Sequence, residues 1–185
     1  IPIGCILLPR EEPSQDVAAL LNFVKDKSEI KQLASGQQYN LDTCKIDIIE
    51  APIASSLEDK RNENESSVIM KITDKGKSVV FTGDATEEEE IAAAAASIKA
   101  DVLKVSHHGS KTSSSYEFLQ AVHPGLAVIS VGADNKFGHP APETLEKLQA
   151  IGAKVLRTDQ AGNIKVVFDG SNCTWYSYRY QGNYF

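Results

Sequence analysis

The chain has 185 residues, of which 42% are hydrophobic and 24% charged, and its formal net charge is −6. This length and composition are those of one globular domain, and they exclude a disordered, collagen-like or repeat-array protein. Because the net charge is negative, the domain has no overall basic surface for tight non-specific DNA binding, and any nucleic-acid contact would be local.

The cysteines and the start of the chain give little functional signal. Cys5, Cys44 and Cys173 are odd in number and lack the spacing of a zinc knuckle or a disulfide framework, so we interpret them as small core residues. Residues 1–9 are too short and too poor in basic residues for a signal peptide, and no apolar run reaches the length of a membrane span. The sequence predicts a soluble domain that is either processed or a fragment.

The first third of the chain predicts an αβ unit followed by a polar loop. A short apolar strand at residues 5–8 precedes a helix from about Asp16, and Val17, Leu20, Leu21 and Val24 share one face of that helix. Residues 45–49 alternate as a strand. Residues 55–66 are polar and without apolar periodicity, which predicts a surface loop.

From residue 68 onward the pattern becomes regular. Residues 68–72 and 78–82 predict two β-branched strands joined in a hairpin at residues 74–77. A helix begins at Thr86, which forms a capping box with Glu89 ahead of the run 91–98. The elements that follow are a strand at 102–105, a helix capped by Ser114, a strand at 127–131, a helix from Pro142 to Gly152, and strands at 155–157, 164–168 and 175–180.

Three loops that follow predicted strands carry chemically active side chains. They are Gly83-Asp84, His107-His108-Gly109-Ser110 and Gly138-His139-Pro140. Ligands bind at the carboxyl ends of strands in α/β sheets. The sequence therefore places three of its four histidines and Asp84 at one edge of the sheet.

Asp84 is the first candidate site residue. An aspartate between a strand and a helix is most often a helix cap, but Thr86 with Glu89 already supplies the capping box. Gly83 beside it permits a close approach of the backbone, as a metal or substrate site requires. We therefore interpret Asp84 as a functional carboxylate.

The paired histidines leave two interpretations open. Neighbouring side chains on a strand point to opposite faces, so His107 and His108 share one site only if the strand has already ended, which Gly109 would permit. Otherwise one imidazole lies in the core. A neutral imidazole is a common zinc or manganese ligand and is oriented through its other nitrogen, for which Ser106 or Ser110 is a candidate partner.

The remaining polar positions have structural alternatives. Residues 111–115 carry hydroxyls and one lysine before a helix N-terminus, which suits a phosphate but is more typical of a helix cap. His139 is either a solvated loop residue or a ligand or proton donor. His123 lies at a helix end, where a cation complements the helix dipole, and we interpret it as structural.

Taken in order, four segments resemble the second half of the metallo-β-lactamase domain of ComEC-type competence proteins. They are Asn64 with Ser67-Val68, Thr82-Gly83-Asp84-Ala85, residues 103–113, and residues 130–140, with Thr158-Asp159 and Gly162 continuing the match. The resemblance covers residues 28–169, and the run around His107 and His108 is long and specific. It implies an α/β fold, the αββα sandwich, of which residues 1–185 would be the C-terminal half of a single, N-terminally incomplete domain.

The resemblance also implies a metal site with zinc, or alternatively manganese, and two ions when complete. Asp84 would bridge the metals, and His108 or else His107 would be the last imidazole ligand; we favour His108 by analogy with a related phosphocholine esterase group. His139 would be the catalytic residue outside the ligand set, as a proton donor or substrate contact. The candidate substrate-binding residues are Asn64, Ser110, Lys111 and Ser113.

The sequence departs from this family in one respect. The family's first motif, His-x-His-x-Asp-His, supplies most of the metal ligands and does not occur here, and residues 1–35 resemble the stretch that follows it. Because catalytic zinc sites take three protein ligands and a water, the residues present could hold at most one metal weakly. Either an upstream segment or a partner chain completes the site, or the activity has been lost.

The function implied by the resemblance is hydrolysis of a phosphodiester, with DNA as a candidate substrate, by a metal-bound hydroxide. A phosphomonoester, a phosphocholine ester or a small lactone is an alternative substrate, because a fold does not fix a function. The alternative function is a non-catalytic binding or regulatory module that kept the fold and lost its metals. The expected partners are the phosphoester and the missing N-terminal half, or a chain that carries it, and no membrane contact is expected.

Overall fold

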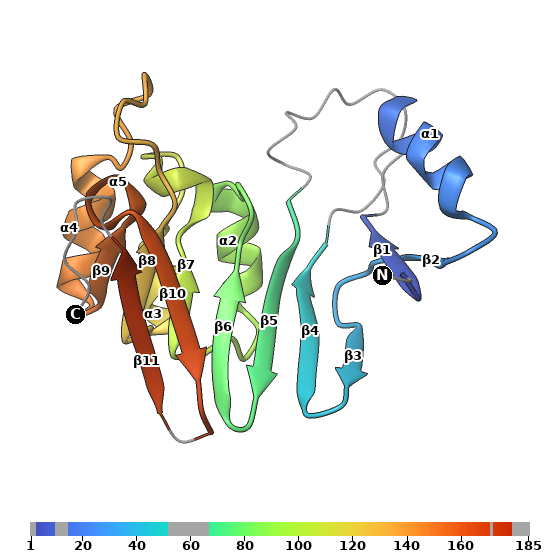
Figure 1. Ribbon diagram of the computed structural model, residues 1–185. Helices are drawn as coiled ribbons and strands as arrows, with labels where there is room; N and C mark the ends of the chain where they lie inside the picture. The colour runs from blue at the N-terminus through green and yellow to red at the C-terminus, as the bar shows by residue number, and fades with distance from the viewer. Residues whose placement is uncertain (1–2, 10–14, 52–66, 171, 179–185) are drawn as a thin grey trace.

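The computed structural model describes residues 3–9, 15–51, 67–170 and 172–178 (Figure 1). Its main element is a seven-stranded mixed sheet in the order β3-β4-β5-β6-β7-β8-β9. These strands are β3 (Gln38–Leu41), β4 (Cys44–Glu50), β5 (Ile69–Asp74), β6 (Lys77–Phe81), β7 (Val102–Lys104), β8 (Leu126–Ile129) and β9 (Lys154–Arg157). Strands β3 to β6 are antiparallel neighbours, and β6 to β9 run parallel.

The β5–β6 hairpin follows directly from its turn sequence. Lys75 and Gly76 both have positive φ angles, 48° and 83°, as a two-residue type I′ turn requires. Asp74 pairs with Lys77 across this turn, which confirms the predicted hairpin. The antiparallel half of the sheet is therefore set by local sequence.

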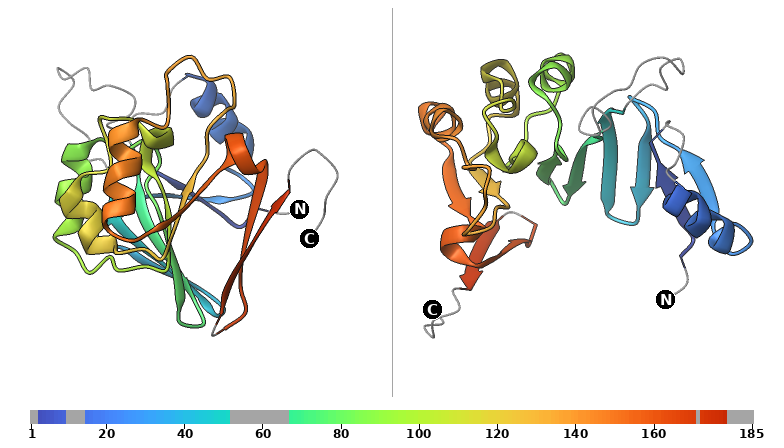
Figure 2. Two further views of the ribbon diagram at one scale, coloured as in Figure 1. Left: turned by 90° about the vertical axis from the view of Figure 1, so that its left-hand side faces the viewer. Right: turned by 90° about the horizontal axis from the view of Figure 1, so that it is seen from above.

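Three helices cover one face of the sheet (Figure 2). They are α2 (Glu87–Ala94), α3 (Tyr116–Val122) and α4 (Pro142–Ala150), and each lies in a connection between two parallel strands. The sheet contributes Val80, Leu103 and Ile129 to a core that Phe118 and Leu148 complete from the helices, and all five are at most 1% exposed. Burial of these side chains is the main stabilising term for this half of the molecule.

Two small units lie at the ends of the opposite face. One unit is an antiparallel strand pair, β10 (Asn163–Phe168) and β11 (Cys173–Tyr178), which follows the short helix α5 (Thr158–Ala161). The other is a parallel strand pair, β1 (Cys5–Leu8) and β2 (Glu29–Gln32), which lies with α1 (Gln15–Val24) near β3 and β4 (Figures 1 and 2). Between these units, Ile72, Val79 and Phe81 point away from the helices, because they alternate with core residues along β5 and β6. Phe81 stays 37% exposed, so this apolar face is only partly covered by described residues.

Most predicted elements are confirmed, and the differences have physical causes. Strands β2 and β3 and helix α5 were not predicted, because four-residue elements without a buried face give no periodic signal. Helix α2 ends at Ala94, because Ile98 leaves the helix and packs in the core. The cap of α3 is Ser115, one residue later than predicted, since Ser114 has a left-handed φ of 62°.

The remaining structural expectations are settled as follows. The cysteines are not core residues, because Cys5 is exposed and Cys44 and Cys173 are partly exposed. The predicted polar loop at residues 55–66 lies outside the described residues. No helix in the described ranges is long and apolar enough to cross a membrane.

A buried carboxylate joins α2 to the loop region of the sheet. The Glu90 side chain has 0% exposure, and its two oxygens accept hydrogen bonds from Ser106 Oγ at 2.5 Å and Ser115 N at 2.7 Å. Burial raises the pKa of Glu90 to about 7, against the opposing effect of these hydrogen bonds. Glu90 therefore fixes the start of the turn that carries His107 and His108.

The Glu90→Gln variant should remove a pH dependence of folding. The pKa of Glu90 is about 7 in the folded chain against an ordinary 4.5, so the folded state retains a proton that the unfolded state releases. Wild-type stability should therefore fall as pH rises through this window, by roughly 3 kcal/mol in total. Urea unfolding at pH values below, within and above the window should show this fall in wild type and in the exposed-site control Glu88→Gln, whereas the fall should be absent in Glu90→Gln. An equal slope in all three proteins would contradict it.

Candidate active site

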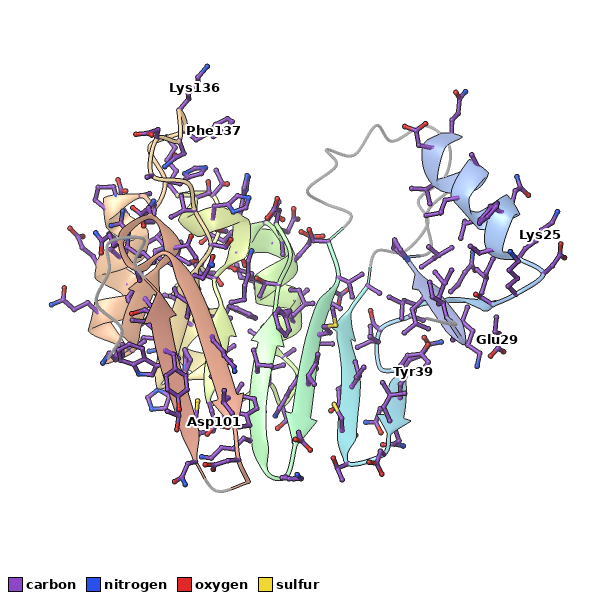
Figure 3. All side chains as sticks on the ribbon, in the orientation of Figure 1. Lys25, Glu29, Tyr39, Asp101, Lys136 and Phe137 are labelled. Carbon is purple, nitrogen blue, oxygen red and sulfur yellow. The ribbon has the colours of Figure 1, made fainter. Side chains whose placement is uncertain are left out.

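Three loops meet at the carboxyl ends of β6, β7 and β8. They are the turn Gly83-Asp84, the 3₁₀ turn Ser106–Gly109 and the long loop 130–140. Lys136 and Phe137 mark the tip of the long loop at this edge, whereas Asp101 lies at the opposite edge of the sheet (Figure 3). Parallel strands bring their carboxyl ends together, so residues distant in sequence become neighbours here.

The Gly83-Asp84 turn is held by contacts on both sides. Gly83 has a φ of 56°, and a Cβ atom there would lie 3.0 Å from Ser67 Oγ, which accepts a hydrogen bond from Asp84 N at 3.0 Å. The Gly83 carbonyl accepts hydrogen bonds from His107 N at 3.3 Å and Lys104 Nζ at 3.0 Å. The position of the Asp84 carboxylate is therefore tied to the histidine turn.

The paired histidines lie beyond the end of their strand. Strand β7 ends at Lys104, and His107 and His108 have left-handed φ angles of 44° and 55°. The strand alternation that would separate the two rings therefore does not apply, and their ring centroids lie 6.3 Å apart. Of the two interpretations left open by the sequence, the structure supports the one in which both imidazoles lie at the same edge.

His108 is oriented with one nitrogen toward Asp84. Its Nδ1 lies 2.6 Å from the carbonyl oxygen of Ser130, so Nδ1 carries the proton of the neutral ring. Nε2 then holds a lone pair and lies 3.8 Å from Asp84 Oδ1. The orienting partner is thus Ser130, not Ser106 or Ser110 as predicted, because the Ser106 hydroxyl is occupied by Glu90.

His107 lies between the other two imidazoles of the site. Its ring centroid is 5.7 Å from that of His139, in an edge-on arrangement. His107 Nδ1 is buried and has no hydrogen-bond partner among the described residues. A buried nitrogen in this state costs free energy unless it binds a further group.

His139 is placed by a loop with its own hydrogen-bond network. Asn135 Oδ1 accepts from His139 N at 2.9 Å, and Asn135 Nδ2 donates to the His139 carbonyl at 2.8 Å. The Phe137 ring stacks on the imidazole with a centroid distance of 5.8 Å. Burial lowers the pKa of His139, and the nearby His107 and His108 lower it further, so the ring is neutral at neutral pH.

The histidine turn and the His139 loop are in direct contact through Gly109. A Cβ atom on Gly109 would lie 2.6 Å from Pro140 Cβ, and Gly109 has a φ of 81°. The Gly109 carbonyl also accepts a hydrogen bond from Ala141 N at 2.8 Å. Only glycine combines this conformation with this close approach.

A cleft of about 440 Å³ opens beside these groups. Its lining includes His108, Ser130, Val131, Asn135, Phe137 and His139. Its size lies within the roughly 300–1,000 Å³ of small-ligand sites. Thr158 Oγ1 supports the wall through hydrogen bonds with Val131 N at 2.7 Å and the Val131 carbonyl at 2.8 Å.

The sequence analysis missed two residues that shape the site, Glu90 and Lys104. Lys104 Nζ lies 3.9 Å from Asp84 Oδ1, and burial lowers the pKa of Lys104 while Asp84 opposes that shift. A lysine in an apolar strand, three residues before His107, was the available signal. Glu90 gave no such signal, because it is one of four consecutive glutamates.

The predicted substrate-binding residues have different surroundings. Ser110 and Ser113 are buried, and their hydroxyls bond within the turn, Ser110 to Thr112 Oγ1 at 3.0 Å and Ser113 to the Ser110 carbonyl at 3.1 Å. Lys111 is exposed, and Asn64 lies outside the described residues. A role for these four residues in substrate binding stays a prediction.

The described residues supply part of a metal site. The 3.8 Å between Asp84 Oδ1 and His108 Nε2 is slightly longer than the roughly 3.3 Å that separates two ligand atoms on one tetrahedral zinc ion, so a small closure would let both atoms bind one ion. However, no group of three or more histidine, cysteine, aspartate or glutamate side chains within the described ranges could hold a metal. Asp84 and His108 therefore fit a metal as two ligands, and they do not complete its coordination.

The Gly109→Ala variant tests the contact that joins two of the loops. The added methyl group must displace the Pro140 ring. The free energy of unfolding should therefore be roughly 1–3 kcal/mol lower than in a control protein with alanine in place of an unhindered glycine. Gly152→Ala is that control, because Gly152 has a similar φ of 77° and nothing within 4 Å of the added atom. Chemical denaturation compares them, and equal losses in both variants would show that backbone strain alone matters.

Comparisons with known proteins place these observations in a family. Residues 53–133 match the family model of the metallo-beta-lactamase superfamily. The chain is 34% identical over 169 residues to ComE operon protein 3 of Bacillus subtilis, which is 89% of this chain and 20% of that protein. It is 38% identical over 108 residues to Recombination protein 2 of Haemophilus influenzae, covering 58% of this chain and 14% of that protein. The chain thus spans a fifth or less of the length of these relatives.

Solved structures agree on the fold. A putative metal-dependent hydrolase from Parabacteroides distasonis superposes with a TM-score of 0.50 at 18% identity, covering 84% of this chain and 76% of that one. The CmlA β-hydroxylase superposes with a TM-score of 0.54 at 10% identity, covering 83% and 38%. Because these identities are low, the likeness concerns the fold alone. The chain belongs to the metallo-β-lactamase superfamily, as a domain of the ComEC competence-protein type.

Proposed function

We propose that this chain provides the Asp84–His108 part of the metal centre of a hydrolase that cleaves phosphodiesters, with nucleic acid as the substrate. The observation that carries the proposal is the 3.8 Å approach of Asp84 Oδ1 to His108 Nε2, with His108 Nδ1 committed to the Ser130 carbonyl. Two electron-pair donors held this close favour a cation between them. Superfamily membership supports a metal-dependent hydrolase, and the names of the competence relatives support the substrate class.

The remaining ligands would come from a segment outside these 185 residues, in the same protein or in a partner chain. Two observations support this part of the proposal. The described residues do not complete a metal site, and the apolar face at Ile72, Val79 and Phe81 is only partly covered. A second sheet packed on that face would bury Phe81 and bring further ligands to the same edge.

The residues of this chain would have separate roles around the cleft. A bound divalent metal supplies Lewis-acid polarisation of the phosphoryl oxygen and lowers the pKa of water. Asp84 and His108 would hold it, and Glu90 would keep the histidine turn in place through Ser106. Because the pKa of His139 is lowered, its neutral ring is better suited to donate a hydrogen bond to the phosphoryl oxygen than to act as an acid.

A non-catalytic binding module is the second candidate function. It is favoured by Lys104, whose ammonium group lies 3.9 Å from Asp84 Oδ1 and partly neutralises that carboxylate without a metal. In such a module the cleft would bind a phosphoester and leave it uncleaved. Metal content separates the two functions.

The 185-residue chain by itself should hold well under one tightly bound metal per molecule, because two ligands do not retain zinc against dialysis. Elemental analysis after loading with Zn²⁺ or Mn²⁺ and dialysis measures this. Weak binding that remains should be lost in Asp84→Ala and retained in Glu146→Ala, an exposed carboxylate on α4. Two metals per chain would show that the ligand set has been undercounted.

In the full-length protein, the roles of Asp84 and His139 should separate. Asp84→Ala should lower metal content and phosphodiesterase activity together, whereas His139→Ala should keep the metal and lose roughly 10²–10³ in rate, the usual cost of one transition-state hydrogen-bond donor. Metal analysis and a phosphodiesterase assay on the same preparations decide this, with Glu146→Ala as control. Metal loss in His139→Ala would make His139 a ligand instead. Bound metal with no hydrolysis in wild type would favour the binding module.

A further inference from the structure

The tip of the long loop beside the candidate active site carries an exposed aromatic ring. Phe137 is 81% exposed, the largest exposed fraction among the large hydrophobic side chains that the structure describes. It lies next to Lys136 at the tip of the loop (Figure 3). Phe137 also lines the cleft of about 440 Å³, together with His108 and His139. The ring therefore belongs to the wall of the cleft and is not an isolated hydrophobic residue of the surface.

A continuous series of ring contacts joins Phe137 to the proposed metal ligands. The Phe137 and His139 rings are stacked, with centroids 5.8 Å apart and planes inclined by 16°. The His139 ring lies 5.7 Å from the His107 ring, which lies 6.3 Å from the His108 ring. His108 Nε2 in turn lies 3.8 Å from Asp84 Oδ1. Phe137 is thus one ring away from His139, the residue proposed to contact the phosphoryl oxygen.

Hydrogen bonds hold the loop closed on both sides of Phe137. Asn135 Nδ2 donates to the carbonyls of Gly132 at 3.0 Å and His139 at 2.8 Å, and Asn135 Oδ1 accepts from His139 N at 2.9 Å. Gly138 completes the turn with a φ of 71°. Because the loop is already ordered, a ligand that contacts Phe137 would lose little free energy to ordering it.

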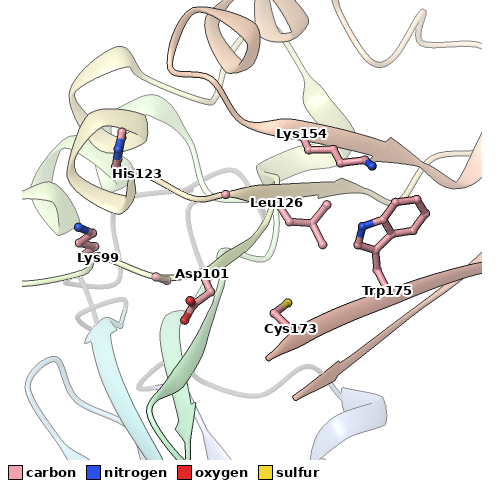
Figure 4. Close-up of a pocket in the computed structure, with 9 residues that line it drawn as sticks. Lys99, Asp101, His123, Leu126, Lys154, Cys173 and Trp175 are labelled. Carbon is pink, nitrogen blue, oxygen red and sulfur yellow. The ribbon is translucent and has the colours of Figure 1, made fainter. Parts of the chain in front are cut away.

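One face of the Phe137 ring is free. Among the described residues its ring contact is with His139, and the exposed fraction of 81% leaves the opposite face accessible. Trp175 differs in this respect. It lines a second cavity, of about 510 Å³, at the opposite ends of the parallel strands, where Lys154 Nζ lies 4.1 Å from its ring centroid and covers one face (Figure 4). A free aromatic face thus occurs beside the cleft that holds the proposed metal ligands.

A flat ring with a free face suits a flat, apolar ligand group. Every nucleobase has such a face, so stacking on a protein ring tolerates any base. The neighbouring Asn135 amide cannot identify a base by its edge, because both of its N–H groups and its oxygen are engaged within the loop. A base at this position would therefore be held by stacking, without sequence readout.

We propose that Phe137 is a specificity-determining residue that stacks on an unpaired base next to the phosphodiester in the cleft, so that the site selects single-stranded nucleic acid or a frayed strand end. In a duplex each internal base is stacked on both faces, and none is free for Phe137 without unstacking. The proposal rests on the proposed function, because it takes a phosphodiester in nucleic acid as the ligand. It goes further by naming the state of the strand and the residue that selects it.

Photocrosslinking and binding measurements on the full-length protein test this proposal. The probe is a short oligodeoxythymidylate with phosphorothioate linkages, which resist hydrolysis, and a central 5-iododeoxyuridine, which crosslinks on irradiation to an aromatic ring stacked on it. Two matched probes are a strand of the same length without bases and a hairpin with the iodinated base paired inside its stem. Crosslinks are mapped by mass spectrometry and affinities are measured by fluorescence anisotropy, each with Mn²⁺ and with EDTA.

We expect the single strand to crosslink at Phe137 and the paired hairpin to give no crosslink there. Wild type should bind the strand with bases about tenfold more tightly than the abasic strand, as expected for one stacked base. Phe137→Leu keeps an apolar side chain without a π-face, so it should abolish this difference and the crosslink, whereas Phe137→Tyr should retain both. The control Tyr116→Leu changes a 44% exposed aromatic residue outside the cleft lining and should behave as wild type.

Circular dichroism and thermal unfolding establish that each variant is folded, and the wild-type crosslink maps the contact without any variant. The proposal is overturned by the absence of a crosslink at Phe137, by equal crosslinking of the paired and unpaired base, by equal wild-type affinity for the strands with and without bases, or by equal behaviour of Phe137→Leu and Phe137→Tyr. Metal content and hydrolysis test the proposed function separately. A metal-bound, hydrolytic protein without base-dependent binding would reject only the role of Phe137, and base-dependent binding without metal or hydrolysis would reject only the hydrolase.

Discussion

The candidate site depends on how three adjacent turns are bound to one another. The Gly83 carbonyl accepts hydrogen bonds from His107 N and Lys104 Nζ, and Gly109 packs against Pro140 so closely that a Cβ atom there would lie 2.6 Å from the ring. Glu90 anchors the middle turn from below through Ser106 and Ser115. None of these contacts uses the side chain of Asp84, His108 or His139, so they fix the places of these three residues and leave their side chains available.

The two ends of the parallel strands differ in chemistry. The carboxyl ends gather Asp84 and three imidazoles around a cleft, and the amino ends gather lysines and Trp175 around a second cavity. The first set consists of electron-pair donors, and the second consists of lysines and an indole ring. One short sheet therefore presents two electrostatically different surfaces, although the net charge of the whole chain is −6.

Membership in the metallo-β-lactamase superfamily fits the proposal that this chain holds part of a metal site. The matched regions make up 20% and 14% of these relatives, and the described residues hold two groups that could share a metal, not three. The partly exposed Phe81 lies on the face of the sheet opposite the helices. Incomplete coordination and incomplete burial thus occur in the same part of the fold, and one further sheet would remedy both.

Sequence alone determined the elements whose signal is local. The capping box of Thr86 with Glu89, the turn at Lys75-Gly76 and the alternation of helices with the parallel strands all appear in the structure. The run around His107 and His108 identified the family. Only the tertiary structure decided what each site side chain meets. His108 bonds to Ser130, Glu90 bonds to Ser106, and Lys104 lies beside Asp84. Each of these contacts joins residues that are 16 to 22 positions apart in the sequence. No local pattern encodes such contacts, because they arise when separate strands align their ends in one sheet.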